Sequence, residues 1–392
     1  MNVLMFFGAL IGVFAVGLWS LFWIRAAWHV GKFRVVSIEP QIPLRADEWP
    51  SLCVVIPACN EAERIEKAAR SLLKQDYPNL ELIFVNDRSD DTTGEIIDQL
   101  AAEDARMTPV HITTLPEGWL GKVHALHVAT ERSDSEWILF TDADVCFEDG
   151  ALRQIVSDAV IHHADHLAGL PEIRPAGPLL DVAISTFFMS SMFFVTPGRI
   201  ADPNESMAVG VGACNLVRRT AFEKTPGFHW LKMETADDLG LGLMMKRWGN
   251  RAQVVFAQPQ LSLDWYSSIG EMIRGLEKNS PGLTHYRWWK ALAMVAFFVG
   301  CLVAPGGLLC LPMVVSIGLL VGLLCVALIA SRVLAKRTCF SLGSFLLAPV
   351  GFAMLTFIFV RSCCLLWWRG GVSWRGTKYD LRLLREGQRI EI

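Results

Sequence analysis

The sequence shows no excess of basic charge. Lysine and arginine together number 36, aspartate and glutamate number 39, and the formal net charge is −3. A protein that binds DNA or RNA usually carries a basic domain, because phosphate contacts provide much of the affinity. The charge balance therefore argues against a nucleic-acid partner.

The ten cysteines show no regular spacing. Cys363 and Cys364 lie inside an apolar run, and no set of cysteines has the spacing of a metal site. The disulfide framework typical of a small secreted domain is also missing. We therefore expect free thiols and a reducing compartment for the soluble part of the chain.

Charge of either sign is scarce, whereas apolar residues are abundant. Only 19% of the residues are charged and 52% are hydrophobic, with a mean hydropathy of +0.36, which is too apolar for an ordinary soluble protein. Residues 3–24 contain no charge and are long enough to span a bilayer. A cleaved signal peptide would have charge before this run and a small-residue cleavage site after it, and neither is clear. We predict an uncleaved anchor, and the basic residues after it place the next region in the cytoplasm.

Two further uncharged stretches lie near the C-terminus. Residues 291–331 are about twice the length of one span, and residues 338–360 match one span. With a cytoplasmic soluble domain, three further spans would put the basic tail outside, against the positive-inside rule. Either one apolar segment is re-entrant or interfacial, or the tail breaks the rule. Pro349 and Gly351 make residues 338–360 the candidate for a broken, non-spanning helix. We predict a multi-pass membrane protein with four regions, namely an anchor at 1–30, a soluble domain at 50–287, membrane segments at 288–367 and a basic cytoplasmic tail at 368–392.

The soluble region alternates short β-rich runs with helical patterns, which predicts an α/β fold with a mixed, mostly parallel sheet. The apolar runs predict strands at 52–56, 80–85, 109–112 and 137–141. The 3.6-residue periodicity predicts helices at 61–73, 93–105 and 123–130.

Three of these strands end in polar loops. They carry Asn60 and Glu61, Asp87, and the pair Asp142 and Asp144. The ends of parallel strands meet at one edge of a sheet, where ligands bind in open α/β folds. Two carboxylates there suit Mg²⁺ or Mn²⁺ with a substrate diphosphate. The alternative for the aspartate pair is a solvated turn after a strand.

Two more side chains fit a donor site at this edge. Asp87 has the chemistry to accept hydrogen bonds from a nucleobase or ribose, although an aspartate there also suits a helix N-cap or turn. Lys122 follows Gly121 at a predicted helix N-terminus, where phosphate binding is favoured. The alternative interpretation of Lys122 is an ordinary surface lysine.

Together these motifs resemble the GT-A domain of family 2-type glycosyltransferases. The Gly118-Trp119-x-Gly121-Lys122 motif and the tail motif at 372–379 resemble the ceramide glucosyltransferase-like and hopene-associated branch. The resemblance covers residues 50–290 well and the tail moderately. The matching motifs are Pro57-x-x-Asn60-Glu61, Asn86-Asp87-Arg88-Ser89, Gly121-Lys122-x-x-Ala125-Leu126 and Asp142-x-Asp144.

The resemblance assigns roles in the second half of the domain. It makes Asp238 the catalytic base and places Asp237 where the family usually has glutamate, although an acidic pair also suits a helix N-terminus. It makes the stretch with Gly210, Gly212 and Asn215 an acceptor-side loop, the alternative being a tight strand start. Residues 179–196 are either a membrane-surface helix or a packed core helix.

Processive and lipid-directed relatives carry a Gln/Arg-x-x-Arg-Trp motif after the base, and this chain departs from it. Arg274 has the better distance from the base and is our candidate near the diphosphate. Arg287 and Trp288 supply an Arg-Trp pair but lie later in the chain, at the edge of the next apolar stretch. Arginine and tryptophan often anchor a protein at a membrane interface, which is the alternative for this pair. The missing motif argues against a processive polymer synthase.

The resemblance predicts a metal-dependent, inverting glycosyltransferase. It would move a sugar from a nucleotide-sugar donor, most simply a UDP-sugar, to the hydroxyl of a lipid in the bilayer. One alternative is transfer to polyprenyl phosphate, and another is a catalytically dead membrane protein that binds nucleotide sugars. A soluble-type nucleotidyltransferase fits less well because such enzymes rarely need membrane spans.

Overall fold

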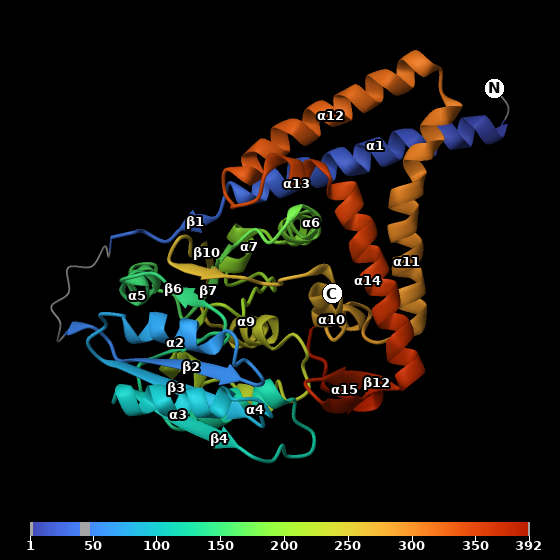
Figure 1. The fold of residues 1–392 in the computed structure, drawn as a ribbon. Helices are drawn as coiled ribbons and strands as arrows, with labels where there is room; N and C mark the ends of the chain where they lie inside the picture. The colour runs from blue at the N-terminus through green and yellow to red at the C-terminus, as the bar shows by residue number, and fades with distance from the viewer. Residues whose placement is uncertain (1–2, 40–47, 391–392) are drawn as a thin grey trace. The chain divides into compact units, whose positions relative to one another are not determined.

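The computed structural model describes residues 3–39 and 48–390, which form two compact units (Figure 1). The helical unit comprises residues 3–32, 174–196 and 266–370. The sheet unit comprises the remaining described residues, including the C-terminal tail from residue 371 onward.

The sheet unit is built on an eight-stranded sheet. Its strand order is β1-β10-β7-β9-β5-β2-β3-β4, and every neighbouring pair is parallel except the two pairs that involve β9. The predicted mixed, mostly parallel α/β sheet is thereby confirmed. The strands are β1 (Arg34–Val35), β2 (Leu52–Ala58), β3 (Leu80–Asp87), β4 (Met107–Ile112), β5 (Trp137–Phe140), β7 (His166–Leu170), β9 (Asn215–Arg218) and β10 (Ala252–Phe256).

Two small sheets complete the strands of this unit. One has the order β6-β11-β8 and the other is a hairpin of β12 and β13. Their bounds are β6 (Cys146–Phe147), β8 (Glu172–Ile173), β11 (Leu261–Leu263), β12 (Gly371–Trp374) and β13 (Thr377–Asp380).

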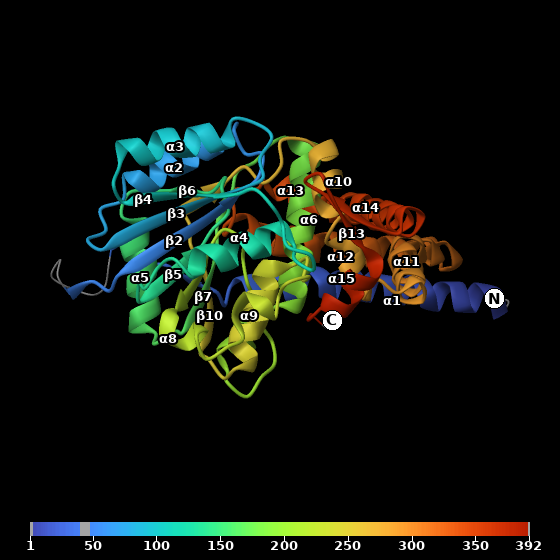
Figure 2. The same ribbon diagram turned by 90° about the horizontal axis from the view of Figure 1, so that it is seen from below.

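Helices cover both faces of the large sheet. Alternate residues of β2 point to opposite faces, so that Val54 packs in the core beneath α2 and α3 while Val55 packs in the core beneath α4 and α9. Figure 2 shows these two pairs of helices on opposite sides of the sheet. The helices of this unit are α2 (Ile65–Leu73), α3 (Thr93–Glu103), α4 (Gly121–Thr130), α5 (Ala151–Ile161), α7 (Pro197–Ala201), α8 (Arg219–Phe222), α9 (Asp237–Arg247) and α15 (Leu381–Gly387).

The antiparallel strand β9 determines where its preceding loop lies. Asn215, the first residue of β9, pairs with Phe140, the last residue of β5. The loop that enters β9 therefore lies at the same sheet edge as the carboxylates that follow β5. Strand direction, not sequence proximity, brings these segments together.

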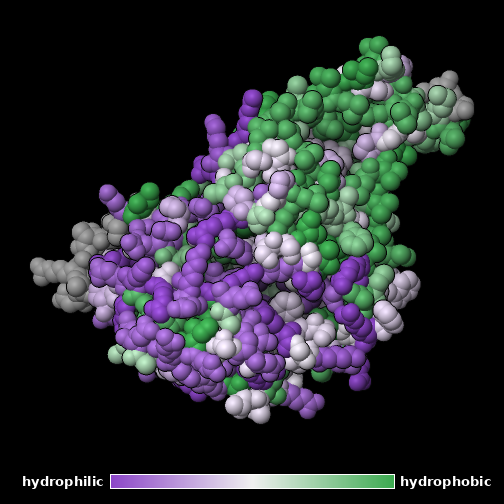
Figure 3. Space-filling view, in the orientation of Figure 1, coloured by the Kyte–Doolittle hydropathy of each residue, from purple (hydrophilic) through white to green (hydrophobic). Residues whose placement is uncertain are grey.

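The helical unit contains four helices that are long and apolar enough to cross a membrane, counted over the described residues. They are Val3–Val30 (α1), Trp288–Cys310, Met313–Ala335 (α12) and Ala348–Arg369 (α14). The second of these consists of α11 (Trp288–Val303) and a 3₁₀ segment, Ala304–Cys310. The shorter helices of the unit are α6 (Pro178–Phe194), α10 (Ile269–Leu276) and α13 (Leu342–Leu346). Large apolar side chains cover much of the helical unit's surface (Figure 3).

Several predicted boundaries differ from those observed, including the following three. α2 begins at Ile65 because residues 61–64 form a turn, with the amides of Arg64 and Ile65 donating to the Glu61 carbonyl. β3 continues to Asp87 because it pairs on both sides, which overrides the low strand propensity of Asn-Asp. The apolar stretch at 338–360 is broken at Leu347, between α13 and α14.

The two compact units also divide the chain differently from the predicted regions. Residues 174–196 and 266–287, which we place in the soluble domain on sequence grounds, belong to the helical unit. The tail, which we predict as a separate basic region, is part of the sheet unit.

Candidate active site

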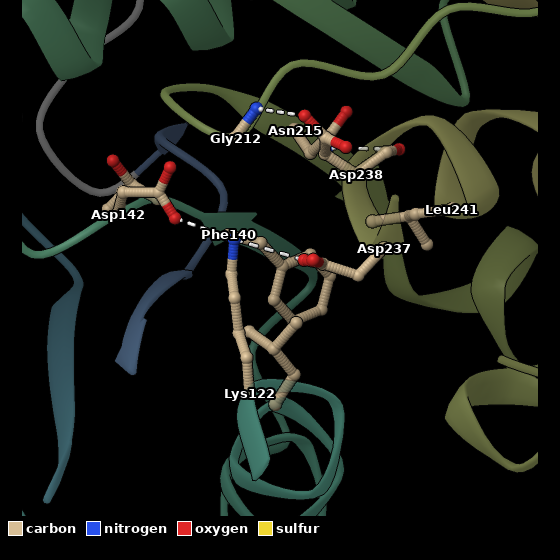
Figure 4. Close-up of a pocket in the computed structure, with 10 residues that line it drawn as sticks. Lys122, Phe140, Asp142, Gly212, Asn215, Asp237, Asp238 and Leu241 are labelled. Atoms are coloured by element: carbon tan, nitrogen blue, oxygen red, sulfur yellow. Dashed lines mark hydrogen bonds and ion pairs between the residues drawn. The ribbon is translucent and has the colours of Figure 1, made fainter. Parts of the chain in front are cut away.

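The carboxyl edge of the large sheet gathers polar groups from four segments. Asp142 follows β5, Lys122 begins α4, Asp237 and Asp238 begin α9, and Gly212 lies in the loop before β9. With Asn215 and apolar neighbours they line a small cavity of about 10 Å³ (Figure 4), room for about one water molecule. Thr141 also lines the cavity, and among the polar residues there it is the one to which sequence reasoning gives no site role.

Lys122 is the central cation of the site. Its Nζ lies 2.7 Å from Oδ1 of Asp142 and 3.0 Å from Oδ2 of Asp237, and Figure 4 shows it between them. Burial acts to lower the pKa of Lys122, but Asp142 and Asp237 outweigh it and raise that pKa well above the ordinary value. The ammonium is therefore held charged between two elements that are 95 residues apart in sequence.

Asp238 is oriented by backbone amides. Gly212 N donates to its Oδ2 at 3.1 Å and Leu239 N donates to its Oδ1 at 2.8 Å. Burial raises the pKa of Asp238, as does the charge of Asp237, whereas Lys122 opposes the rise. A fixed carboxylate with a raised pKa has the properties of a general base.

Gly210 and Gly212 are needed because the chain itself approaches them closely. A Cβ on Gly210 would lie 1.7 Å from the carbonyl oxygen of Asp238, and one on Gly212 would lie 2.4 Å from Oδ2 of Asp142. Asn215 is buried, and its amide donates to the Asp238 carbonyl at 3.4 Å. These three predicted acceptor-side residues thus pack closely against Asp238 and Asp142.

Asp144 lies in an electronegative environment. Burial, followed by the charges of Asp142 and Glu61, raises the pKa of Asp144 to about 7. Arg64 is its nearby cation, at 3.8 Å. Such mutually repelling carboxylates fit a divalent cation, which would relieve the repulsion. Over residues 3–39 and 48–390 no three His, Cys, Asp or Glu side chains form a metal-holding group, so water and a bound diphosphate would supply the other ligands.

Asp87 is buried at the end of β3 and paired with its neighbour. Arg88 Nε lies 2.7 Å from Oδ1 of Asp87, and Arg88 NH2 donates to Oδ2 at 3.0 Å. Gly121 is needed beside this pair, because a Cβ there would lie 2.3 Å from Oδ2 of Asp87. The α4 N-terminus, which positions Lys122, thus packs directly on the predicted nucleotide-binding residue.

Asn60 and Glu61 join the loops after β2 and β3. Asn60 Oδ1 accepts from the Asp90 amide at 2.8 Å, and the Glu61 amide donates to Thr93 Oγ1 at 2.8 Å. Pro57 is buried inside β2. Arg274 lies on α10 in the helical unit, and its donor role stays a prediction.

Sequence reasoning gives no role to several charged residues around the site. Arg64 pairs with Asp144, Arg88 pairs with Asp87, and Arg375 of the tail pairs with Glu61. Arg64 and Arg88 each lie close in sequence to a predicted site residue, which is a signal that could have found them. Arg375 is 314 residues from Glu61, and no local pattern links the two.

Residues 53–225 match the model of the family described as Glycosyl transferase family 2. This segment is similar to a glycosyltransferase family 2 domain. The matched segment includes Asp87, Lys122, Asp142 and Asn215, whereas Asp237 and Asp238 lie beyond it. The likeness to this family therefore covers the first half of the site, and the second half rests on the geometry.

Curated glycosyltransferases resemble part of the chain. The chain is 33% identical over 147 residues to the "Probable glycosyltransferase YdaM" of Bacillus subtilis, covering 35% of each chain. It is 28% identical over 130 residues to the "GalNAc(5)-diNAcBac-PP-undecaprenol beta-1,3-glucosyltransferase" of Campylobacter jejuni, covering 33% of this chain and 41% of that protein. The matches to curated relatives thus span less than half of those proteins' lengths.

A solved structure shares the fold of the chain. It is "Mannosyltransferase PcManGT from Pyrobaculum calidifontis in complex with GDP-Man and Mn2+", with a TM-score of 0.57 and 17% identity over 88% of this chain and 97% of that one. At this identity the likeness shows the fold alone. The GT-A fold expected from the sequence is confirmed.

Proposed function

We propose that the protein is an inverting glycosyltransferase that moves a sugar from a nucleotide-sugar donor to the hydroxyl of a membrane lipid. The observation that carries the proposal is the convergence of Lys122, Asp142 and Asp238 at one edge of the sheet. In this proposal Lys122 offers a cation to a phosphate, Asp142 offers a carboxylate to a metal, and Asp238 serves as the base, all within one small site.

The chain's own residues supply three functions in this proposal. Asp87 holds the nucleoside, and Lys122 offers positive charge to the diphosphate. Asp238 takes the proton of the acceptor hydroxyl as that oxygen attacks the anomeric carbon. The bond from this carbon to the nucleoside diphosphate breaks, and attack from the opposite face inverts the configuration.

Asp142 and Asp144 are the residues that would hold Mg²⁺ or Mn²⁺. The cation would stabilise the charge that develops on the leaving diphosphate. Asp142 reaches this role only if Lys122 shares or releases it, since the two are paired at 2.7 Å. The raised pKa of Asp144 supports a site that favours a cation.

A lipid acceptor is supported by the apolar helices in the same chain. Four described helices are long and apolar enough to cross a membrane, and they expose large side chains such as Phe297, Val314 and Leu324. An acceptor that stays in the bilayer would suit an enzyme with such helices. The name of the Campylobacter relative, which states a lipid-linked acceptor, is consistent with this choice.

The experiment is sugar transfer to lipids extracted from the host membrane, using full-length protein in liposomes with labelled UDP- and GDP-sugars and Mn²⁺. We expect Asp238→Asn to lower kcat by about 10² to 10⁴ while the affinity for nucleoside diphosphate stays unchanged. Asp149→Asn, on an exposed loop away from the cavity, is the matched control.

Undiminished transfer by Asp238→Asn would overturn the assignment of the base. It would also favour an acidic acceptor such as polyprenyl phosphate, which needs little help from a base. Failure of the wild-type protein to transfer any sugar with metal present would favour a binding protein without activity.

A further inference from the structure

The C-terminal tail begins with a tight hairpin. β12 pairs with β13 in antiparallel register, with Trp374 opposite Thr377, so that Arg375 and Gly376 form a two-residue loop. Both loop residues have positive φ, 46° and 76°, as a type I′ turn requires. Glycine suits this conformation, whereas arginine pays a steric cost there. An arginine at this position therefore calls for a reason beyond the turn itself.

The Arg375 side chain supplies that reason. Its NH1 donates to the Asn60 carbonyl at 3.0 Å and its NH2 pairs with the Glu61 carboxylate. Both partners lie in the loop after β2 that the sequence predicts for donor binding. The guanidinium thus holds this loop from the opposite end of the chain.

The rest of the hairpin contacts the other two donor loops. Thr377 Oγ1 accepts from Arg88 NH1 at 3.1 Å, and Arg88 in turn holds Asp87. The Tyr379 hydroxyl accepts from the Gly121 amide at 3.3 Å, immediately before Lys122. Tyr379 is 7% exposed, so this contact is buried.

Backbone strain collects at the same place. Six non-glycine residues among those described have positive φ, and three of them are Asn60, Arg88 and Arg375. These three, which come from distant parts of the chain, are connected by the contacts above. Strained residues that gather in this way mark a place where the surrounding structure is built to hold a particular geometry.

The end of the tail is tied to the segment that carries the base. The amides of Arg389 and Ile390 donate to Glu234 Oε2 at 2.7 and 3.2 Å, and Glu234 Oε1 accepts from the Ala236 amide at 3.2 Å. Glu234 is 2% exposed. The tail therefore connects the donor loops to the start of α9, where Asp237 and Asp238 lie.

We propose that this tail is part of the donor site, with Arg375, Thr377 and Tyr379 acting as positioning residues for the nucleotide. They hold the loop after β2, the end of β3 and the start of α4 in the arrangement that a nucleoside diphosphate needs. The inference rests on the proposed function and extends it by naming the segment that completes the donor pocket.

The test uses Arg375→Gly in the full-length protein. Glycine relieves the turn conformation, so the variant should keep its thermal stability while losing the contacts to Asn60 and Glu61. We expect the Kd for UDP or GDP, each titrated with Mn²⁺, to rise about tenfold, because charge-assisted hydrogen bonds that order the site are lost. The donor KM should rise similarly, with little change in kcat at saturating donor.

Three companion variants distinguish a loss of nucleotide positioning from a loss of folding. Arg375→Lys should restore part of the affinity, and Tyr379→Phe, which removes only the hydroxyl, should weaken binding by a smaller factor. Arg382→Ala, whose side chain is 86% exposed on the same tail, should bind like the wild type.

Two results would count against the inference in distinguishable ways. Equal nucleotide affinity of the wild type and Arg375→Gly would overturn the role of the tail and leave the proposed function intact. If the wild type bound neither UDP nor GDP, the donor assignment would fail and the inference would fall with it.

Discussion

At the residue scale, the site depends on one lysine among acidic groups. Lys122 contacts Asp142 and Asp237 and opposes the rise in the pKa of Asp238. Its charge therefore serves both halves of the proposed reaction, the leaving diphosphate and the base. Removing it should change the rate and also its pH dependence.

We predict that Lys122→Met moves the acidic limb of the pH–rate profile to higher pH. The base must be ionised to act, and loss of the neighbouring cation raises the pKa of Asp238 further above the ordinary carboxyl range. The plateau value of kcat should also fall, by about 10², because a stabilising charge near the leaving group is gone. The measurement is kcat against pH with labelled donor and saturating metal.

Lys224→Met provides the control, because it removes the same charge from an exposed position of the sheet unit. Its profile should match that of the wild type. An unshifted acidic limb in Lys122→Met would mean that Asp238 is not the titrating base or that Lys122 does not act on it.

At the scale of elements, the site requires close packing of α4 against the end of β3. Gly121 makes this possible, since any side chain there meets Oδ2 of Asp87 at 2.3 Å and Arg88 NH2 at 2.5 Å. Asp87 is 4% exposed and paired, so it has little freedom to move away. A methyl group at position 121 should therefore displace the nucleotide-binding aspartate.

We predict that Gly121→Ala raises the donor KM at least tenfold and lowers stability by about 1–3 kcal/mol through overpacking. The matched control is Gly198→Ala on α7, where an added Cβ meets nothing within 4 Å. Nucleotide titration and thermal unfolding of both variants are the measurements. Unchanged donor binding in Gly121→Ala would show that Asp87 does not depend on this contact.

Sequence patterns predict the elements well where one physical signal dominates. The buried runs at Leu52 and Trp137 are strands, and Asp142, after β5, meets Lys122 at the carboxyl edge of the sheet. Strand order and direction follow from pairings such as β5 with β9, which no local pattern encodes. The tail contacts are harder still to predict from the sequence, because Arg375 and Glu61 come together only in the folded chain.

At the scale of the whole molecule, the tail limits how the chain can cross a membrane. Residues 371–390 belong to the same compact unit as the large sheet. We therefore expect the tail and the large sheet to lie on the same side of any bilayer. We therefore infer that the chain between residues 266 and 370 crosses a bilayer an even number of times, if it crosses one at all. It contains three helices of spanning length and character, α11 with its 3₁₀ extension, α12 and α14. If the protein lies in a bilayer, we therefore expect that these three helices do not all span it.

The arrangement of the helical unit agrees with this count. α1 runs beside α12, and α11 beside α14, but the two pairs run in different directions (Figure 1). The apolar window of α14 is 39% buried, against 6% for α11 with its extension and 11% for α12. A helix so covered by protein has less surface to offer to lipid. The four helices thus do not form one bundle of parallel spans.

We predict that an epitope tag at the C-terminus and one inserted at Asp76, which is 89% exposed in the sheet unit, are reached from the same membrane face. Impermeant antibody applied to sealed cells and to inverted vesicles makes the measurement, and nucleotide binding shows that each tagged protein is folded. A tag before α1 is the internal control, which should lie on the opposite face if that helix crosses. Tags at Asp76 and the C-terminus on opposite faces would mean that the tail cannot pack on the donor loops, because no segment reaches Asn60 across a bilayer. The membrane topology and the donor site are therefore tested by the same pair of tags.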